Sequence, residues 1–187
     1  MKLNRIKKIC NGTYLNMYIA EYKEGKHTKP YELVSRNKDL TLETFGKDKI
    51  SNAVGIIALN KDKSKILLQR EFRMSTNNWV YNFPGGLIDE EETSEQASIR
   101  ELGEETGLDI IEVLDILPPA YTTVGFSDEL VETIVCIADG EFRESTSIDE
   151  QIEAKWYTKE EIQELFRDKV YMSLRTQAIL YMWISSN

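Results

Sequence analysis

A glycine-rich turn followed by a strongly capped helix is the feature that most limits how this chain can fold. Thr93, with Gln96 three residues later, has the form of a capping box, and Gly107 stands where a left-handed C-cap belongs. These signals predict a helix over 94–106. The preceding stretch 83–89 carries a proline and two glycines between apolar residues, so its backbone carbonyls can approach a ligand closely.

The rest of the chain alternates short apolar runs with polar turns, which predicts strands around this helix. A second capping box, at Thr158 and Glu161, predicts a further helix to about residue 166. An amphipathic pattern predicts a last helix over about 173–183. Strands are expected at 14–22, 31–36, 40–45, 53–59, 66–69, 110–117, 130–138 and 154–157. Strands mixed with helices indicate an α+β or three-layer fold, with a domain boundary near residue 50.

Composition excludes several classes of protein. The chain has 187 residues, 41% of them apolar, and a formal net charge of -9, so a broad basic surface for nucleic acid or anionic membrane is absent. A small anionic substrate would therefore need locally placed positive charge or a metal ion. Cys10 and Cys136 have no metal-ligand spacing and are expected to be free thiols. Without a signal-peptide pattern or a long apolar run, a cytoplasmic protein is expected.

Three glutamates lie on one face of the predicted helix. At roughly 100° per residue, Glu101, Glu104 and Glu105 fall within about 100° of one another. Such a stripe is often only a solvated surface, and its mutual repulsion costs a few tenths of a kcal/mol per pair. A bound cation would reverse that sign. Carboxylates together with a backbone carbonyl suit magnesium, which keeps some waters and binds substrate phosphates.

These residues resemble the Nudix box. Gly86, then Glu92 after five residues, then residues 100–108 after seven more match every defining position of that box. The resemblance implies a Nudix-type α/β/α sandwich with a mixed β-sheet, and hydrolysis of a nucleoside diphosphate linked to another group. It also implies that Arg100 pairs with Glu92 and orients the glutamates.

The resemblance assigns a metal site by position. Glu101 and Glu105 resemble direct ligands, Glu104 a ligand or its support with a part in catalysis, and the carbonyl of Gly85 a further ligand. The implied cofactor is Mg²⁺, with Mn²⁺ as a substitute. Bound magnesium would neutralise the diphosphate and lower the pKa of a bound water.

Outside the box the chain is similar to the ADP-ribose pyrophosphatase branch of the family. Residues 31–36 match a segment that begins with a base-stacking aromatic, and residues 69–73 match a basic strand segment whose last arginine contacts phosphate. Tyr31, Arg36 and Arg73 are therefore expected to bind substrate. The alternatives are that Tyr31 is a plain strand aromatic and that Arg73 is a solvated surface charge. Residues 1–50 are expected to form an antiparallel β extension, and residues 51–187 the Nudix domain. The extension is expected to cross to the partner chain of a homodimer.

Two departures from the branch leave the substrate open. Val124 stands where the branch usually has a proline, and Asn82 replaces its acidic residue. The leading expectation is hydrolysis of ADP-ribose to AMP and ribose 5-phosphate. The alternatives are another nucleotide sugar, a nucleoside triphosphate, and a non-catalytic ligand-binding module.

The attacking water requires a general base, because the box glutamates are expected to be committed to metal. Residues 139–151 have the composition of a mobile loop and end in an acidic run that resembles the loop end where the branch carries its catalytic glutamate. Alignment on Ile152 assigns that role to Glu150. Asp149 and Glu153 are alternatives, as is a merely solvated loop.

Overall fold

The computed structural model describes residues 1–47, 50–147 and 150–186. The elements of the chain are β1 (Lys2–Asn11), β2 (Asn16–Glu24), β3 (His27–Ser35), β4 (Ala53–Leu59), β5 (Ile66–Arg73), β6 (Asn78–Asn82), α1 (Ser94–Thr106), β7 (Asp109–Tyr121), β8 (Leu130–Asp139), β9 (Ile152–Tyr157), α2 (Lys159–Arg167) and α3 (Leu174–Ser185). They divide into two compact units, Met1–Asn52 with Pro118–Glu132, and Ala53–Leu117 with Thr133–Asn187.

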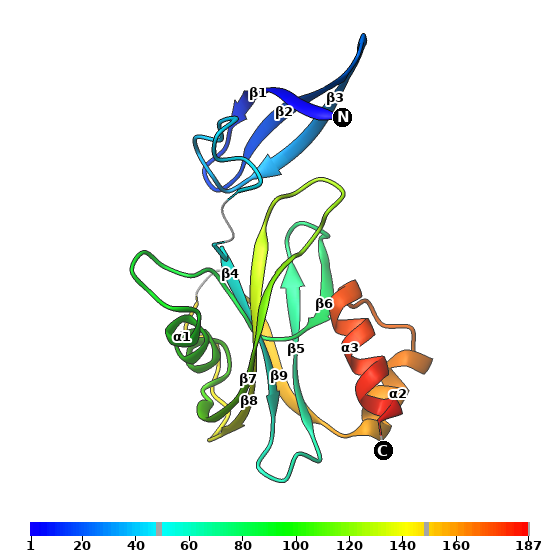
Figure 1. Cartoon of the computed structure of the whole chain (residues 1–187). Helices are drawn as coiled ribbons and strands as arrows, with labels where there is room; N and C mark the ends of the chain where they lie inside the picture. Colours follow the sequence, from blue (N-terminus) through cyan, green and yellow to red (C-terminus); the bar gives the residue numbers. More distant parts are fainter. Residues whose placement is uncertain (48–49, 148–149, 187) are drawn as a thin grey trace. The chain divides into compact units, whose positions relative to one another are not determined.

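The first unit contains an antiparallel sheet in the order β1-β2-β3 (Figure 1). The pairing of Glu24 with His27 closes the β2–β3 hairpin, and Gly25 takes a left-handed φ of 58° in its turn. Its small core consists of Tyr18, Ala20 and Leu33. The predicted antiparallel extension is therefore present as a sheet with a core of its own.

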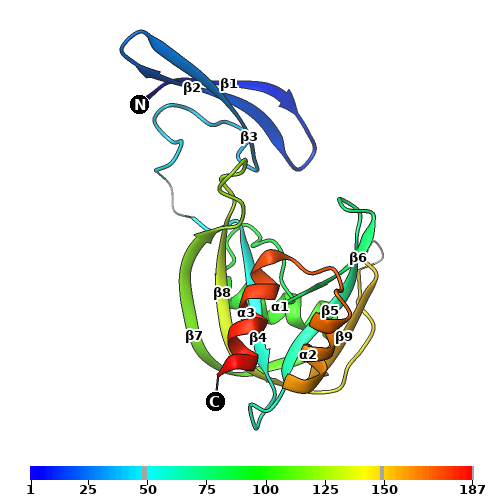
Figure 2. The ribbon, with the colours of Figure 1, turned by 90° about the vertical axis from the view of Figure 1, so that its right-hand side faces the viewer.

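The second unit is a mixed sheet with helices on both faces. Its strand order is β6-β5-β4-β8-β7, and β9 pairs with β5. Figures 1 and 2 show α1 against one face and α2 with α3 against the other. This is the α/β/α arrangement that the sequence predicted.

Two apolar layers explain this arrangement. On the α1 side, Leu102 and Leu108 pack with Leu67 of β5 and Ile134 of β8. On the other side, Ile66 and Leu68 of β5 pack with residues of α2 and α3. Because successive side chains of a strand point to opposite faces, β5 supplies both layers with alternate residues.

The helix predictions are close to the structure. α1 has the predicted bounds, and both predicted capping boxes are present, at Thr93 with Gln96 and at Thr158 with Glu161. Gly107 has the left-handed conformation expected of a C-cap, with a φ of 79°. Among the described residues, no helix is long and apolar enough to cross a membrane.

One strand prediction was wrong, and two strands of the structure were not predicted. Residues 40–45 form a turn, because Thr41 and Thr44 hydrogen-bond to nearby backbone groups while Leu40 and Phe45 pack on the first unit's core. β1 was not predicted, since its many lysines conceal the strand pattern; lysines are common on sheet edges such as this one. β6 was also missed, because it is short and has asparagine at both ends.

Candidate active site

The carboxylate helix α1 packs through its apolar face and is anchored at both ends. At its start, the Thr93 hydroxyl accepts from the Gln96 N–H at 3.2 Å, and the Gln96 side chain accepts from the Thr93 N–H at 2.9 Å. At its end, the Gly107 N–H donates to the Gly103 carbonyl. Leu102 is fully buried in the core between these anchors. The side chains at 100–105 are therefore presented from a rigid element.

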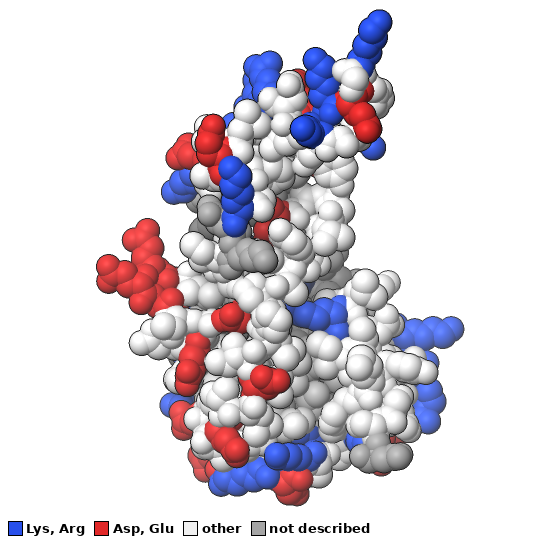
Figure 3. Space-filling view, in the orientation of Figure 1, with Lys and Arg blue, Asp and Glu red and all other residues white. Residues whose placement is uncertain are grey.

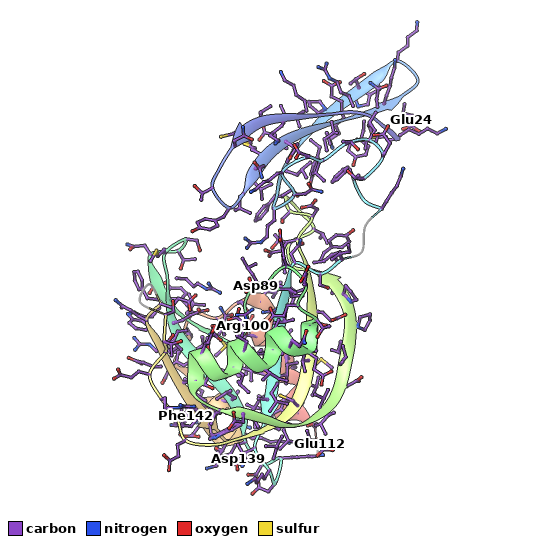
Figure 4. The ribbon with its side chains drawn as sticks, turned by 90° about the vertical axis from the view of Figure 1, so that its left-hand side faces the viewer. Glu24, Asp89, Arg100, Glu112, Asp139 and Phe142 are labelled. Atoms are coloured by element: carbon purple, nitrogen blue, oxygen red, sulfur yellow. The ribbon has the colours of Figure 1, made fainter. Side chains whose placement is uncertain are left out.

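Arg100 bridges three glutamates on this helix and its preceding loop. Its guanidinium donates to both carboxylate oxygens of Glu92, at 3.0 and 2.8 Å, and to Glu101 at 2.8 Å. A longer contact of 3.4 Å reaches Glu104. The hydrogen bonds to Glu92 raise the pKa of Arg100 further above its usual range. Figure 4 shows Arg100 beside Asp89, which ends 3.9 Å away.

The pairing of Arg100 with Glu92 that the resemblance implied is thus present in the structure. A bidentate arginine–carboxylate pair has fixed geometry, so it also fixes where the remaining guanidinium nitrogen meets Glu101. The loop that carries Glu92 is strongly acidic, and Figure 3 shows acidic side chains gathered on it. Arg100 offsets part of that charge.

Glu105 is the most deeply buried of the box glutamates, with 5% of its surface exposed. One carboxylate oxygen accepts from the Gly85 N–H at 3.0 Å, and the other accepts from the Gln69 side-chain amide at 3.2 Å. Burial raises the pKa of Glu105 to about 8, and the negative charges of Glu101 and Glu71 add to the effect. A buried carboxyl in this environment is stabilised by any cation placed beside it.

The glycine turn lies against these carboxylates. A Cβ on Gly86 would come within 2.2 Å of a Glu101 carboxylate oxygen, and a Cβ on Gly85 would come within 2.3 Å of the Val54 carbonyl oxygen. Gly85 also has a φ of 152°, which disfavours other residues. The Gly86 carbonyl accepts from the Val54 N–H of β4 at 2.9 Å. Backbone and carboxylates therefore approach each other without an intervening side chain.

These groups fit magnesium by their chemistry. Two carboxylates, Glu101 and Glu105, flank a backbone turn, which gives the hard oxygen donors that magnesium prefers. Within 1–47, 50–147 and 150–186, no group of three or more carboxylate, histidine or cysteine side chains converges closely enough to hold an ion. The reason is visible in the contacts: Glu101 and Glu104 turn toward Arg100, whereas Glu105 turns toward Gln69.

The candidate general bases differ in their surroundings. Glu150 is exposed, and its charge contributes to the raised pKa of Glu101, for which burial is the largest cause. Glu153 lies on β9, where it pairs with Arg70 of β5 at 3.0 Å. Asp149 lies outside the described residues. Glu153 is thus engaged by an arginine, whereas the charge of Glu150 acts on the carboxyl of Glu101.

Arg73 lies on the same face of β5 as Gln69, two alternate positions further along. It forms an ion pair of 2.9 Å with Glu71, which is 5% exposed. Asn82 donates to the same carboxylate at 2.6 Å. The asparagine that departs from the ADP-ribose pyrophosphatase pattern therefore acts as a donor to a buried acid, where a second acid would be repelled.

Sequence reasoning gave no role to Gln69 or Glu71. Gln69 contacts Glu105 directly, and Glu71 holds Arg73. A signal was present in the sequence, because both are polar residues on the face of β5 that Leu67 buries. Polar residues on a buried strand face require partners, and such partners are often functional groups.

The first unit carries the other predicted substrate residues. Tyr31 is 40% exposed on β3, and its hydroxyl donates to the Gly125 carbonyl. Arg36 pairs with Glu129 at 2.7 Å and lines a pocket of about 320 Å³ in this unit. Asp128 also lines that pocket and accepts from the Ser35 hydroxyl at 2.9 Å. The aromatic ring of Tyr31 is thus exposed enough to contact a ligand, while the guanidinium of Arg36 is already paired with the carboxylate of Glu129.

The α/β/α fold with a carboxylate helix beside a glycine turn defines a hydrolase of the Nudix class. In agreement, residues 49–174 match the profile of the NUDIX domain, and the chain belongs to that family. It is 27% identical to an ADP-ribose pyrophosphatase of Bacillus subtilis (strain 168) over 179 residues, 93% of this chain and 88% of the relative.

Two further comparisons cover different shares of the chain. An 8-oxo-dGTP diphosphatase of Proteus vulgaris is 34% identical over 86 residues, which covers 43% of this chain and 75% of the relative. A solved ADP compounds hydrolase superposes with a TM-score of 0.74 at 17% identity, covering 97% of this chain and 91% of that one. The chain is therefore a Nudix hydrolase with the fold of the solved enzyme along nearly its whole length.

Proposed function

We propose that this enzyme hydrolyses the diphosphate of ADP-ribose, in a magnesium-dependent reaction in the cytoplasm, to give AMP and ribose 5-phosphate. The observation that carries the proposal is the pair Glu101 and Glu105 on either side of the Gly85–Gly86 turn. Support for the substrate comes from the ADP-ribose pyrophosphatase that aligns with 93% of the chain, including the first unit.

In this proposal, Glu101, Glu105 and the Gly85 carbonyl hold the metal, with Glu104 as a further ligand or support. Bound magnesium supplies charge neutralisation of the diphosphate and a bound water of lowered pKa. Arg100 keeps Glu101 in place through its bidentate pair with Glu92. Without that pair, the carboxylates would be free to separate by mutual repulsion.

The chain's own residues carry the remaining steps. Arg73 binds phosphate oxygens, and Glu71 holds it for that role. Glu150 accepts a proton from the attacking water as the new phosphorus–oxygen bond forms and the diphosphate bond breaks. Cleavage leaves one phosphate on the nucleoside and the other on the ribose, so AMP and ribose 5-phosphate both leave as phosphate monoesters.

A substrate panel tests the proposal. With magnesium present, we expect turnover of ADP-ribose to exceed that of other nucleotide sugars, dinucleoside polyphosphates and nucleoside triphosphates. Val124, which is 79% exposed, stands in the place of the branch's proline, so the panel must include several nucleotide sugars. A preference for triphosphates would overturn the substrate assignment while leaving the metal site untouched.

Replacement of Tyr31 by alanine is expected to raise KM for the nucleotide sugar much more than it lowers kcat. Stacking on the base is remote from the reacting phosphorus, so it is lost equally in the ground and transition states. Tyr31→Phe separates the ring from the hydroxyl that contacts Gly125 and should keep KM near wild type. Tyr14→Ala, at a tyrosine that is 75% exposed in the same unit, serves as the control. An unchanged KM for Tyr31→Ala returns this residue to a structural role.

We also propose a homodimer in which residues from about 10 to 50 cross to the partner chain. The buried core cluster of the antiparallel sheet β1-β2-β3 consists of Tyr18, Ala20 and Leu33, which is small for an independent sheet. Sedimentation velocity at micromolar concentration should give the mass of a dimer. A fully active monomer under those conditions would contradict this proposal.

A further inference from the structure

The segment Gly140–Ser147, which precedes Glu150, is fastened to the end of α1. The Arg143 N–H donates to the Thr106 carbonyl at 2.9 Å, and the Thr146 N–H donates to the Glu104 carbonyl at 3.0 Å. The Arg143 guanidinium donates to the Gly107 carbonyl at 3.2 Å. The last carbonyls of a helix have no partner within the helix, so they accept bonds from whatever packs there. We call Gly140–Ser147 the docking segment.

Gly107 permits this close approach. A Cβ at that position would come within 2.8 Å of the Arg143 Cβ and within 2.9 Å of the Arg143 backbone nitrogen. The last glycine of the box therefore has two functions: it takes the left-handed C-cap conformation, and it leaves room for the docking segment. α1 itself, described over its full length, has no basic residue in its last turn, and Arg143 supplies positive charge at that end.

The docking segment is also held from the side of the sheet. The Phe142 ring lies 6.2 Å from the Trp156 ring, centroid to centroid, and Trp156 packs against the core that α1 shares with β8. Figure 4 shows Phe142 on the other side of α1 from Arg100. On the far side of Glu150, the Phe72 N–H of β5 donates to the Gln151 carbonyl at 3.1 Å. Glu150 is thus bracketed by a contact with α1 and a contact with β5.

We propose that Arg143 and Thr146 are positioning residues that couple the general base Glu150 to the metal-binding helix α1. The inference rests on the proposed function in one respect, the role of Glu150. Its physical basis is that the metal ligands and the base must be held in one geometry. A displacement of about 1 Å can cost about 10²-fold in rate.

Two variants remove the docking contacts separately. Thr146→Pro deletes the backbone N–H that donates to Glu104, because proline has no such group. Arg143→Met keeps most of the side-chain length and removes the guanidinium that contacts Gly107. We expect kcat to fall about 10-fold or more in Thr146→Pro and about threefold in Arg143→Met, with KM changed less than threefold. Thr146→Ala, which keeps the N–H, should recover most of the loss.

Lys61→Met is the matched control for Arg143→Met. It removes a cation that pairs with Asp139, at the base of the docking segment, rather than with α1. We expect its kcat to stay within twofold of wild type. Melting temperatures and circular dichroism of all variants, and hydrogen exchange over 141–151, distinguish undocking from global unfolding.

A double-mutant cycle of Thr146→Pro with Glu150→Gln tests whether the docking contacts act through Glu150. The measurements use the fastest substrate of the panel. If docking acts through Glu150, Thr146→Pro in the Glu150→Gln background lowers kcat less than twofold further. A further tenfold loss in that background would show a role apart from Glu150 and overturn the inference. Thr146→Pro with wild-type kcat, alongside an inactive Glu150→Gln, would also overturn it and leave the proposed function standing. Full activity of Glu150→Gln would remove the base assignment itself, and the inference with it.

Discussion

Glu105→Gln is expected to lose nearly all turnover while the metal-free protein becomes more stable at alkaline pH. The substitution removes charge from a proposed metal ligand without changing its size, so magnesium loses an anionic oxygen donor. In the absence of metal, the same substitution removes a buried charge, since Glu105 is 5% exposed. Opposite effects on activity and stability would distinguish loss of the metal site from loss of the fold.

The pH dependence gives the sign of the stability change. Burial raises the pKa of Glu105 from 4.5 to about 8 in the folded protein. Between these values the folded state binds a proton that the unfolded state releases. Through this group, the unfolding free energy therefore falls by about 1.4 kcal/mol for each pH unit in that window. The contribution is fully present below pH 4.5 and is lost as pH rises through about 8.

Thermal melts in the presence of a chelator, at pH 6 and pH 9, measure this contribution. Wild type should lose more stability than Glu105→Gln over that interval. Glu95→Gln, at an acidic residue in the first turn of α1, is the control and should follow wild type in both activity and melting. Activity of Glu105→Gln within threefold of wild type, with unchanged magnesium dependence, would be incompatible with the metal-site assignment.

Glu150→Gln is expected to lower kcat by about 10²-fold or more and to leave substrate affinity nearly unchanged, which is the usual result of losing a general base. Glu150 is exposed, and its negative charge adds to the raised pKa of Glu101, for which burial is the largest cause. Single-turnover rates with saturating enzyme separate the chemical step from product release.

Glu153→Gln is the matched variant for this test. Glu153 is paired with Arg70 at 3.0 Å, so its loss should affect the β5–β9 pairing more than the chemistry. An inactive Glu153→Gln beside a fully active Glu150→Gln would move the role of base to Glu153. If both variants were fully active, the proton acceptor would lie within α1.

Local signals were sufficient for the helix that carries the site. Thr93, Gln96 and Gly107 set the bounds of α1, because capping depends on side chains within a few residues of the helix end. The strand β4 was likewise predicted in full, since a continuous apolar run between polar turns requires burial on both faces. The strand predicted at 40–45 was wrong because the apolar side chains of this segment pack on the core from a turn.

Contacts between distant residues could not be read from the sequence. Gln69 reaches Glu105 across 36 residues of chain, and Asn82 reaches Glu71 from the neighbouring strand. Residues 139–151 have the polar composition of a mobile loop, yet Arg143 and Thr146 are fastened to α1 by backbone hydrogen bonds. Composition predicts exposure, but it carries no information about which carbonyls a backbone N–H will meet.

The sequence by itself indicated the family and the glutamates of α1, because both depend on the spacing of the box from Gly86 to residue 108, and through the family it implied the three-layer fold. Only the tertiary structure decided which of those glutamates is buried. Glu105 is buried because β5 and the Gly85 turn close over it, whereas Glu104, one residue earlier, stays exposed. Burial depends on what packs against a side chain, and that is a property of the whole sheet rather than of the helix.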